Sequence, residues 1–524
     1  MISISKETKN SYICSVLVLL MLTLSFFNQN KFIISYNNHY HLLLFSKICL
    51  LGATYFAIKY FQRVEIKITK ENLFFICLIV IFGGYFTFWL IGQYPGYIMT
   101  DSYETIFQVM NLDFTNWFSS IHPFLYLILF QIIPHPIVVP IFQIILSSII
   151  FSLIINKIYK VLGLVPALFL FLLIFSSVPI IVNTIFYTRD TIYGVLHLLL
   201  IYFIFDSLTT DNTTQKRLIC IISISLLLSI YRSEGILLLF LVPFSFFIMK
   251  KISFKKTLII SVTSILFFIP LSFTLDKLLS IKNVGNYKLT LIMNPLGYLI
   301  QNNYFTVSGE KDMEIISNVL DVPKVKELST PYEIPAYWAG AWDWKKSDKD
   351  YSKLYQLFFR MVGDNIPLFI NNRILNFLAS TGFSDSGGLY YLDGAKWSTE
   401  NKSYQLIQEK FALKNDLFPN VKSFQNKIIE FTLKFKGANG GRILFWNFVP
   451  FIAILSLLIL LYKWVPISSI CSIIILYRVP IIFLISPGSQ FKYYYSVYLF
   501  GLIAIFFAFT EYKLKKRTLN EVHG

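Results

Sequence analysis

The sequence predicts an all-α polytopic integral membrane protein with about twelve transmembrane helices. Of its 524 residues, 55% are hydrophobic and only 14% are charged, whereas soluble domains carry about a quarter charged residues. Long uncharged apolar runs recur along the chain, unlike the short alternating segments of outer-membrane barrels. The composition therefore excludes a soluble globular enzyme, and the 52 Phe and 32 Tyr residues exclude a disordered chain.

The predicted spans are apolar runs of about 15 to 22 residues, close to the length that crosses a bilayer as a helix. They cover residues 12–28, 41–58, 73–91, 136–155, 161–181, 191–206, 218–231, 235–249, 257–275, 443–462, 465–486 and 492–510. Residues 124–133 are too few to span and precede Pro134, so they predict an interfacial or re-entrant helix.

Basic residues set the expected orientation, because cytoplasmic loops of membrane proteins are enriched in Lys and Arg. Lys and Arg cluster in alternate short loops, in residues 250–256 and 513–517 above all. We therefore expect both termini to be cytoplasmic. The abundance of Lys, Ile, Asn and Phe favours an AT-rich bacterial source, and hence a bacterial plasma membrane. The net charge of +17 then reflects topology within a lipid bilayer, and no nucleic-acid partner is expected.

This topology divides the chain into three parts. Residues 1–275 form an N-terminal membrane domain whose first external loop covers residues 92–122. Residues 276–442 form an extracytoplasmic, mostly helical domain, about the size of a small independent domain. Residues 443–524 add C-terminal membrane helices and a basic cytoplasmic tail.

The sequence carries no glycine-rich phosphate loop, HExxH helix, GxSxG elbow or paired CxxC. Nucleotide hydrolysis is therefore not the expected source of energy. All five cysteines lie inside apolar runs, so we expect no disulfide framework in the aqueous segments. The informative residues are ionisable side chains at the predicted outer face, because a charge near the membrane is costly and tends to mark function.

The first external loop carries the first cluster of such residues. A Tyr-Pro-Gly turn is followed by Asp101, which would begin an amphipathic helix along the interface with its apolar side towards lipid. Glu104 lies one turn further on, and His122 ends the loop before a proline. An alternative role for Asp101 is that of a helix N-cap. A capping or structural role is the alternative for His122.

Three further clusters lie at the same predicted face. Arg189 and Asp190 follow the fifth span, and the alternative there is a salt-bridged helix start. Arg232 lies in a tight turn, where it could instead be an arginine that reaches the membrane surface. Arg478 lies inside a span, at a cost of roughly 2.5 kcal/mol unless it faces a polar partner. Lys492 follows a Ser-Pro-Gly turn and could be a plain interfacial anchor.

These features resemble the GT-C superfamily of membrane glycosyltransferases, which includes protein O-mannosyltransferases and lipid A aminoarabinose transferases. The likeness is greatest to an uncharacterised Gram-positive bacterial branch. It rests on the Tyr-Pro-Gly turn, the aspartate of the first external loop and the His-Pro pair about twenty residues later. The resemblance implies a GT-C-like fold with Asp101 as catalytic base. Many members have an adjacent Asp-Glu pair, whereas the glutamate here is displaced to Glu104.

The resemblance also implies roles for the other clusters. Lys492-Tyr493 takes the place of an Arg-Tyr pair that is expected to bind the lipid phosphate of the donor, with Arg478 and Arg232 nearby. A second group would bind the acceptor or a metal, and it comprises Asp190, Arg189, Glu104 and His122. A divalent ion, Mg²⁺ or Mn²⁺, is the one cofactor suggested.

The expected function is that of an inverting glycosyltransferase that moves sugar from a polyprenyl-phosphate donor to a glycan, lipid or protein acceptor in the cell envelope. Such a donor is already activated, so the enzyme needs a base and cations but no ATP motif. Trp338, Trp342 and Trp344 in the long loop could stack on sugars or form an interfacial belt. The alternatives are a polytopic transporter or a lipid or polysaccharide flippase, and a non-catalytic surface-assembly protein.

Overall fold

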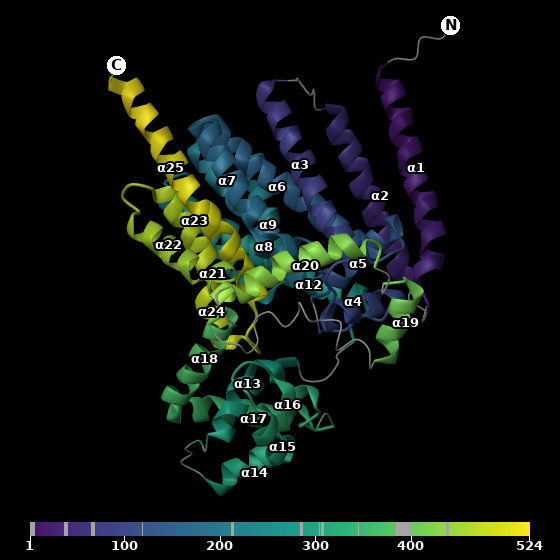
Figure 1. Ribbon diagram of the computed structural model, residues 1–524, viewed down its shortest axis with the longest axis vertical. Helices are drawn as coiled ribbons and strands as arrows, with labels where there is room; N and C mark the ends of the chain where they lie inside the picture. Colours follow the sequence, from purple (N-terminus) through teal and green to yellow (C-terminus); the bar gives the residue numbers. More distant parts are fainter. Residues whose placement is uncertain are drawn as a thin grey trace.

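We describe the fold from a computed structural model of the chain (Figure 1). It describes residues 6–35, 40–63, 69–117, 119–210, 214–282, 287–302, 304, 309–343, 345–383, 401–413, 416–435 and 440–523. Within these ranges the chain is helical, and the β-pairing consists of three isolated bridges. The prediction of an all-α fold is confirmed.

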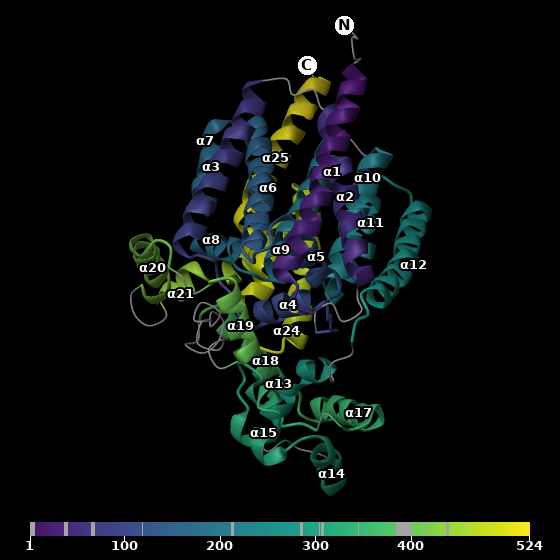
Figure 2. The ribbon, with the colours of Figure 1, turned by 90° about the vertical axis from the view of Figure 1, so that its right-hand side faces the viewer.

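The long helices run side by side in one bundle, with the two ends of the chain at the same end of it (Figures 1 and 2). The first half of the bundle contains α1 (Lys6–Phe32), α2 (Tyr40–Arg63), α3 (Lys70–Gly92), α4 (Thr100–Asn111), α5 (Ile121–Ile132), α6 (Val138–Leu162), α7 (Leu164–Ser176), α8 (Val178–Thr184), α9 (Arg189–Thr209), α10 (Gln215–Tyr231), η1 (Ser233–Leu237), α11 (Leu238–Ile248) and α12 (Phe254–Leu278). The C-terminal part adds α22 (Val449–Leu460), α23 (Pro466–Leu476), α24 (Arg478–Ile485), η4 (Phe491–Tyr494) and α25 (Tyr495–His523).

Eight helices of the described chain are long and apolar enough to cross a membrane, or nine if the bent pair α7–α8 counts as one span. These eight fall on eight of the runs expected from the sequence, and the bent pair falls on the run 161–181. The runs 12–28, 218–231 and 235–249 are also helical, in α1, α10 and η1–α11, but do not stand among the eight. A multi-pass helical membrane protein is therefore confirmed, while the number twelve stays a prediction.

The predicted extracytoplasmic segment 276–442 contains two groups of helices. The first group forms a lobe beyond the end of the bundle opposite the termini (Figures 1 and 2), and it comprises α13 (Tyr287–Gln301), α14 (Glu310–Val319), α15 (Val322–Leu328), α16 (Pro335–Trp338), α17 (Asp348–Asp364) and α18 (Ile366–Ser380). The second group packs back onto the bundle and comprises α19 (Lys402–Lys410), α20 (Pro419–Lys434) and α21 (Gly440–Phe445).

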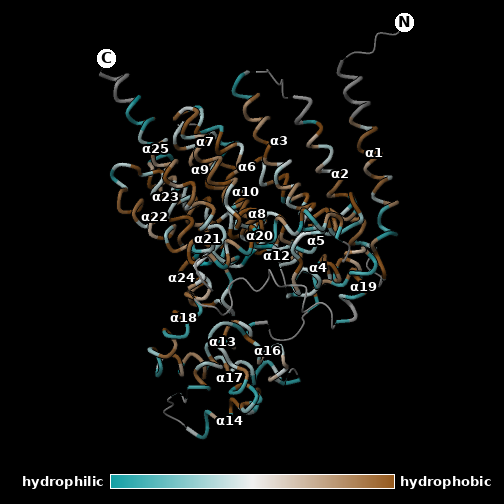
Figure 3. Tube along the Cα trace, in the orientation of Figure 1, coloured by the Kyte–Doolittle hydropathy of each residue, from teal (hydrophilic) through white to brown (hydrophobic). Residues whose placement is uncertain are grey.

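The lobe has a hydrophobic core of its own. The amphipathic pattern of α17 supplies part of it, because Leu354, Leu357, Phe358 and Met361 recur at helical spacing and are all buried. Hydrophilic residues are frequent along the lobe, whereas hydrophobic residues dominate the long helices of the bundle (Figure 3). This contrast is the one expected between a segment in water and helices in lipid.

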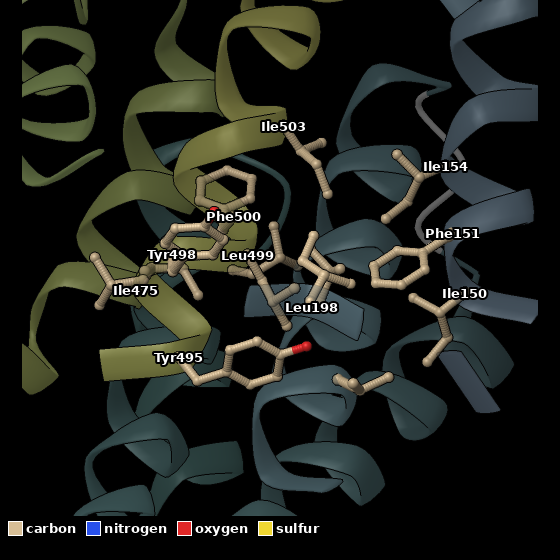
Figure 4. Packing of buried hydrophobic residues seen from close by; sticks show 14 of the residues in the cluster. Ile150, Phe151, Ile154, Leu198, Ile475, Tyr495, Tyr498, Leu499, Phe500 and Ile503 are labelled. Atoms are coloured by element: carbon tan, nitrogen blue, oxygen red, sulfur yellow. The ribbon is translucent and has the colours of Figure 1, made fainter. Parts of the chain in front are cut away.

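The bundle is centred on α6, α9, α23 and α25. Figure 4 shows side chains from all four helices meeting there, with Leu198 of α9 close to Leu499 of α25 and Phe151 of α6 beside them. Large aliphatic and aromatic side chains fill the space between the helices, and the Tyr498 hydroxyl lies 3.0 Å from that of Ser177. This packing fixes the start of α9 relative to the start of α25.

Helices α4 and α5 differ from the sequence prediction in what they contact. The apolar side of α4 is expected to face lipid, but Ile106, Val109 and Met110 are fully buried. Helix α5 packs on this side of α4, and its own Leu127 and Phe130 are buried in the same cluster. The apolar side of α4 therefore packs against α5 inside the protein and does not face lipid as expected.

The arrangement of lobe and termini leads to a labelling prediction. In a variant whose five cysteines are replaced by serine, a cysteine at Ser317 of α14 should react in intact cells with a membrane-impermeant maleimide. A cysteine at Gln215, at the opposite end of the bundle, should react only after the cells are broken, because basic loops are retained in the cytoplasm. Labelling of Gln215→Cys alone in intact cells would contradict the predicted orientation.

Candidate functional site

The first external loop is held by pairing with the chain between α8 and α9. The backbone turns at Gly96, whose φ of +111° suits glycine, and a Cβ there would lie 2.5 Å from the Ile185 carbonyl oxygen. The amide of Tyr97 donates to the Ile185 carbonyl at 3.2 Å, and the Tyr187 amide donates to the Tyr97 carbonyl at 3.0 Å. The Tyr187 hydroxyl donates to the Pro95 carbonyl at 2.9 Å. Two segments far apart in sequence are thus locked together.

This pairing brings two of the predicted clusters into contact. The Ser102 hydroxyl at the start of α4 donates to the Tyr187 carbonyl at 2.5 Å. Asp101 directly precedes Ser102, and Asp190 lies three residues after Tyr187 in the first turn of α9. The starts of α4 and α9 therefore lie side by side.

Asp101 lies in the first turn of α4, but it is not the cap. The N-cap residue is Met99, so the alternative of Asp101 as an N-cap is wrong. The Asp101 side chain is 42% exposed, and its Oδ2 lies 3.5 Å from Nζ of Lys492. Asp101 is therefore a carboxylate that is open on one side and faces a cation on the other.

Lys492 reaches Asp101 from η4, which leads into α25. Its side chain is buried, and its Nζ lies 3.1 Å from the Met99 sulfur. The same nitrogen lies 5.9 Å from the centre of the Phe186 ring and 5.8 Å from that of Tyr493. A plain interfacial anchor would extend to the membrane surface, whereas this lysine points into the protein.

A chain of buried ion pairs lies behind this contact. Arg232 contacts the Asp190 carboxylate directly and also lies 2.6 Å from Glu234. Glu234 also forms an ion pair with Arg478 of α24, whose Nη2 lies 3.0 Å from Oε1 of Glu234. The Nη1 atom of Arg478 donates a hydrogen bond to the Ser496 hydroxyl at 2.5 Å. All four charged side chains are buried or nearly so.

These contacts decide between the alternatives for Arg232 and Asp190. Arg232 does not extend to the membrane surface, because it is held between two carboxylates. Asp190 is a salt-bridged residue of a helix start, where it pairs with Arg232 and Thr188 caps the helix. Leaving one of these charges without its partner would cost about 3–5 kcal/mol.

A small polar pocket opens where α4, α5, α9 and η4 meet. It is lined by Asp101, His122, Tyr187, Thr188, Arg189, Asp190, Lys492 and Tyr493. Five of the eight predicted site residues are among these lining residues. Arg232 and Arg478 do not line the pocket. Arg232 instead pairs with Asp190, and Arg478 pairs with Glu234.

Glu104 lies one turn after Asp101 on α4 and outside the pocket lining. It accepts a hydrogen bond from Gln108 at 3.3 Å. Burial raises the pKa of this carboxyl, and the charges of Asp101 and Asp113 add to the increase. Helix α19 covers this part of α4, because Tyr404 stacks on Tyr103 with ring centres 5.1 Å apart.

His122 is buried at the start of α5. Its Nδ1 lies 2.8 Å from the Tyr231 hydroxyl. Burial lowers the pKa of His122 to about 3, and the positive charge of Arg189 contributes to the decrease. His122 is therefore neutral at physiological pH.

The described residues do not form a site that fits Mg²⁺ or Mn²⁺. No three His, Cys, Asp or Glu side chains gather within the described ranges. Asp190 already contacts Arg232, and Asp101 lies next to Lys492. Mg²⁺ is commonly held by one or two carboxylates together with waters and substrate phosphates, whereas both carboxylates of this pocket face basic side chains.

Sequence reasoning assigned no role to Glu234, which joins Arg232 to Arg478. The sequence gives little indication of this role, since Glu234 is a single acidic residue in a short turn, two positions after Arg232. With it, the site holds four basic side chains and three acidic ones, which leaves an excess of one positive charge: Arg189, Arg232, Arg478 and Lys492 against Asp101, Asp190 and Glu234.

Sequence reasoning also missed Arg373 of α18, which is fully buried and donates to neutral acceptors. Its guanidinium donates to the Ser486 carbonyl at 2.8 Å and to the Asn372 side chain at 2.9 Å, and it also contacts Asn294. Burial lowers the pKa of Arg373 to about 10. A buried cation of this kind depends on each of its hydrogen bonds.

Arg373 connects the lobe to the segment that precedes Lys492. That segment, residues 486–490, receives a second tie where the Ser489 amide donates to the Tyr332 carbonyl at 2.7 Å. Both contacts come from residues of the lobe. The position of Lys492 therefore depends on the lobe as well as on the bundle.

The predicted aromatic residues of the long segment have different environments. Trp338 is 61% exposed, and its ring centre lies 5.3 Å from that of Trp117 in the first external loop. Trp342 stacks on Tyr337 at 5.1 Å. Trp344 lies outside the described residues.

Comparison of the chain with protein-family models, with curated proteins and with solved structures finds no match. The resemblance to GT-C enzymes therefore rests on the short motifs and the predicted topology alone.

The low pKa of His122 makes stability depend on pH. The pKa is about 3 in the folded chain, whereas an unfolded histidine titrates near about 6.5. Below about pH 6.5 the unfolded chain binds a proton that the folded chain does not, so stability decreases as pH falls. By about pH 5 the loss is about 2 kcal/mol. Between about pH 7 and pH 5, thermal unfolding of the purified His122→Asn variant should show a loss of stability that is about 2 kcal/mol smaller than that of the wild type.

The contacts of Arg373 predict how its removal acts. Arg373→Met keeps the apolar stem but leaves the Ser486 carbonyl without its donor, so residues 486–490 should loosen. Hydrogen exchange should increase in peptides that cover residues 486–494, while peptides from α6 and α9 stay protected. Arg373→Lys, which can keep one of the contacts, should give an intermediate increase. Unchanged exchange in Arg373→Met would show that the lobe does not hold this segment.

Proposed function

We propose that this protein is a membrane glycosyltransferase that transfers a sugar from a polyprenyl-phosphate donor to an acceptor hydroxyl in the cell envelope. The observation that carries the proposal is the contact between Asp101 and Lys492 in a pocket next to further basic side chains. A half-open carboxylate beside a buried cation supplies the two groups that such a transfer needs, a base and a partner for the departing phosphate.

The proposed reaction uses residues that line the pocket. The Asp101 carboxylate accepts the proton of the acceptor hydroxyl, whose oxygen attacks the anomeric carbon of the donor sugar. The bond from that carbon to the polyprenyl phosphate breaks as the new glycosidic bond forms, with inversion at the anomeric carbon. Lys492 and Arg189 attract the phosphate as it takes up the electron pair. The products are the glycosylated acceptor and the free polyprenyl phosphate.

The buried arginines have supporting roles in this proposal. Arg232 and Arg478 were expected to contact the phosphate, but each contacts a carboxylate and neither lines the pocket. We assign them to hold Asp190 and Glu234 in place. Asp190 then remains available to accept a hydrogen bond from the acceptor at the pocket wall, and no step depends on a metal ion.

The alternative class is a transporter or a lipid or polysaccharide flippase. Transporters of known folds place their charged sites near the bilayer midplane, at the interface between repeats. The polar pocket instead lies at the starts of α4 and α9, at the end of the bundle where the lobe attaches. This position favours chemistry at the outer surface, on donors and acceptors that are both present there.

Asp101→Asn tests the proposal, because it keeps the shape of the side chain but removes the base. Transfer of sugar into the envelope should fall by roughly 10²-fold or more. The measurement is the sugar content of purified cell envelope from a strain that depends on this protein, corrected for the amount of protein in the membrane.

Glu104→Gln provides a matched control. Glu104 lies on the same helix and loses the same charge, but it does not line the pocket, so sugar incorporation should stay close to the wild-type level. Full incorporation by the Asp101→Asn variant would remove Asp101 from the reaction and would favour a transporter.

A further inference from the structure

A second hollow lies far from the polar pocket, on the outer surface of the bundle. This apolar groove runs between α7, α22 and α25, has a volume of about 820 Å³ and is open along one side. It is lined by Leu162, Val165, Pro166, Phe169, Leu173, Phe451, Ile454, Gly501, Leu502, Ile505, Phe506, Phe509, Tyr512, Lys513 and Lys516. Several of these apolar side chains are exposed, Phe169 and Phe509 among them.

One end of the groove is closed by helix packing. At Gly501 of α25 an added Cβ would lie 2.2 Å from the Cβ of Phe451 on α22, so these two helices touch there. Glycine allows this close approach, and the groove begins beyond it. The groove is therefore bounded at this end by the contact between α22 and α25.

The other end carries two basic side chains on the face that lines the groove. From Phe509, Lys513 follows four residues later and Lys516 three residues after that, a spacing that keeps all three on one side of a helix. Lys515 lies on the same turn, but it does not line the groove. The groove is therefore lined by apolar side chains along its length and by two lysines at its end nearest the C-terminus of α25.

The length of the groove matches one leaflet of a bilayer. Lys513 lies twelve residues beyond Gly501, which is about 18 Å along a helix. The hydrocarbon part of one leaflet is about 15 Å thick. An acyl chain that lies against Phe169, Ile505 and Phe509 would therefore bring its headgroup to the level of Lys513.

We propose that this groove binds an anionic phospholipid from the leaflet nearest the chain termini. Its acyl chain would occupy the apolar channel, and its phosphate headgroup would contact Lys513 and Lys516. The site is separate from the proposed reaction, because Lys513 lies 21 residues after Lys492 on the same run of helix, which is about 31 Å.

Lipid retention by the purified full-length protein tests this site. The protein is reconstituted in nanodiscs of phosphatidylcholine and phosphatidylglycerol at about four to one, extracted again in a mild neutral detergent, and its retained lipids are quantified by mass spectrometry. Wild-type protein should retain phosphatidylglycerol well above its share of the input. Each basic residue near an anionic headgroup favours binding about fivefold. Lys513→Gln/Lys516→Gln should therefore lose most of the enrichment.

Two further variants separate a site from general charge attraction. Lys463→Gln/Lys515→Gln removes the same charge from the same end of the bundle but leaves the groove lining intact, so the enrichment should persist. Ile505→Trp fills the groove while both lysines remain, so it should lower retention. Retention in the input ratio by the wild type, or equal losses in the two double variants, would overturn the proposal.

Discussion

The structure of the site depends on one constraint, which is that a guanidinium inside a membrane domain needs a partner. Arg232 and Arg478 are buried in the bundle, where an isolated charge costs several kcal/mol. Glu234 satisfies both of them, and Asp190 completes the partners of Arg232. Because these residues come from α9, η1 and α24, the ion pairs fix three segments relative to one another. Of these three segments, α9 also lines the polar pocket, through Arg189 and Asp190.

The sequence was sufficient to predict the individual membrane helices, because each apolar run is visible in the composition of its segment. An apolar run of sufficient length must become a helix in lipid, because every backbone group has to be satisfied within the segment. Every expected span is mainly helical within the described residues, although breaks interrupt the runs 161–181 and 443–462. The apolar side of α4 was expected to face lipid, and this expectation is wrong. Amphipathic sequences look alike whether their apolar side faces lipid or, as at Ile106 and Met110, another helix.

The candidate site was predictable as a set of residues but not as a set of contacts. The cost of charge in a membrane singled out Asp101, Asp190, Arg232, Arg478 and Lys492 one at a time. Their partners are distant in sequence: Asp190 is 42 residues from Arg232, and Glu234 is 244 residues from Arg478. No local pattern encodes such pairs. Glu234 and Arg373 were missed for this reason, since each acquires its role only when separate segments come together.

The pairing also bears on which carboxylate would act as the base in the proposed reaction. Asp190 and Glu234 are buried and their carboxylates are already held by guanidinium groups. Asp101 differs because its one cationic contact is longer, at 3.5 Å, and because 42% of its side chain is exposed. In the proposed reaction, the acceptor would therefore approach Asp101 from the exposed side, next to charges that are held in place by ion pairs. Loss of Arg232 would then act on Asp101 only indirectly, through the start of α9 and the Tyr187 carbonyl that holds Ser102.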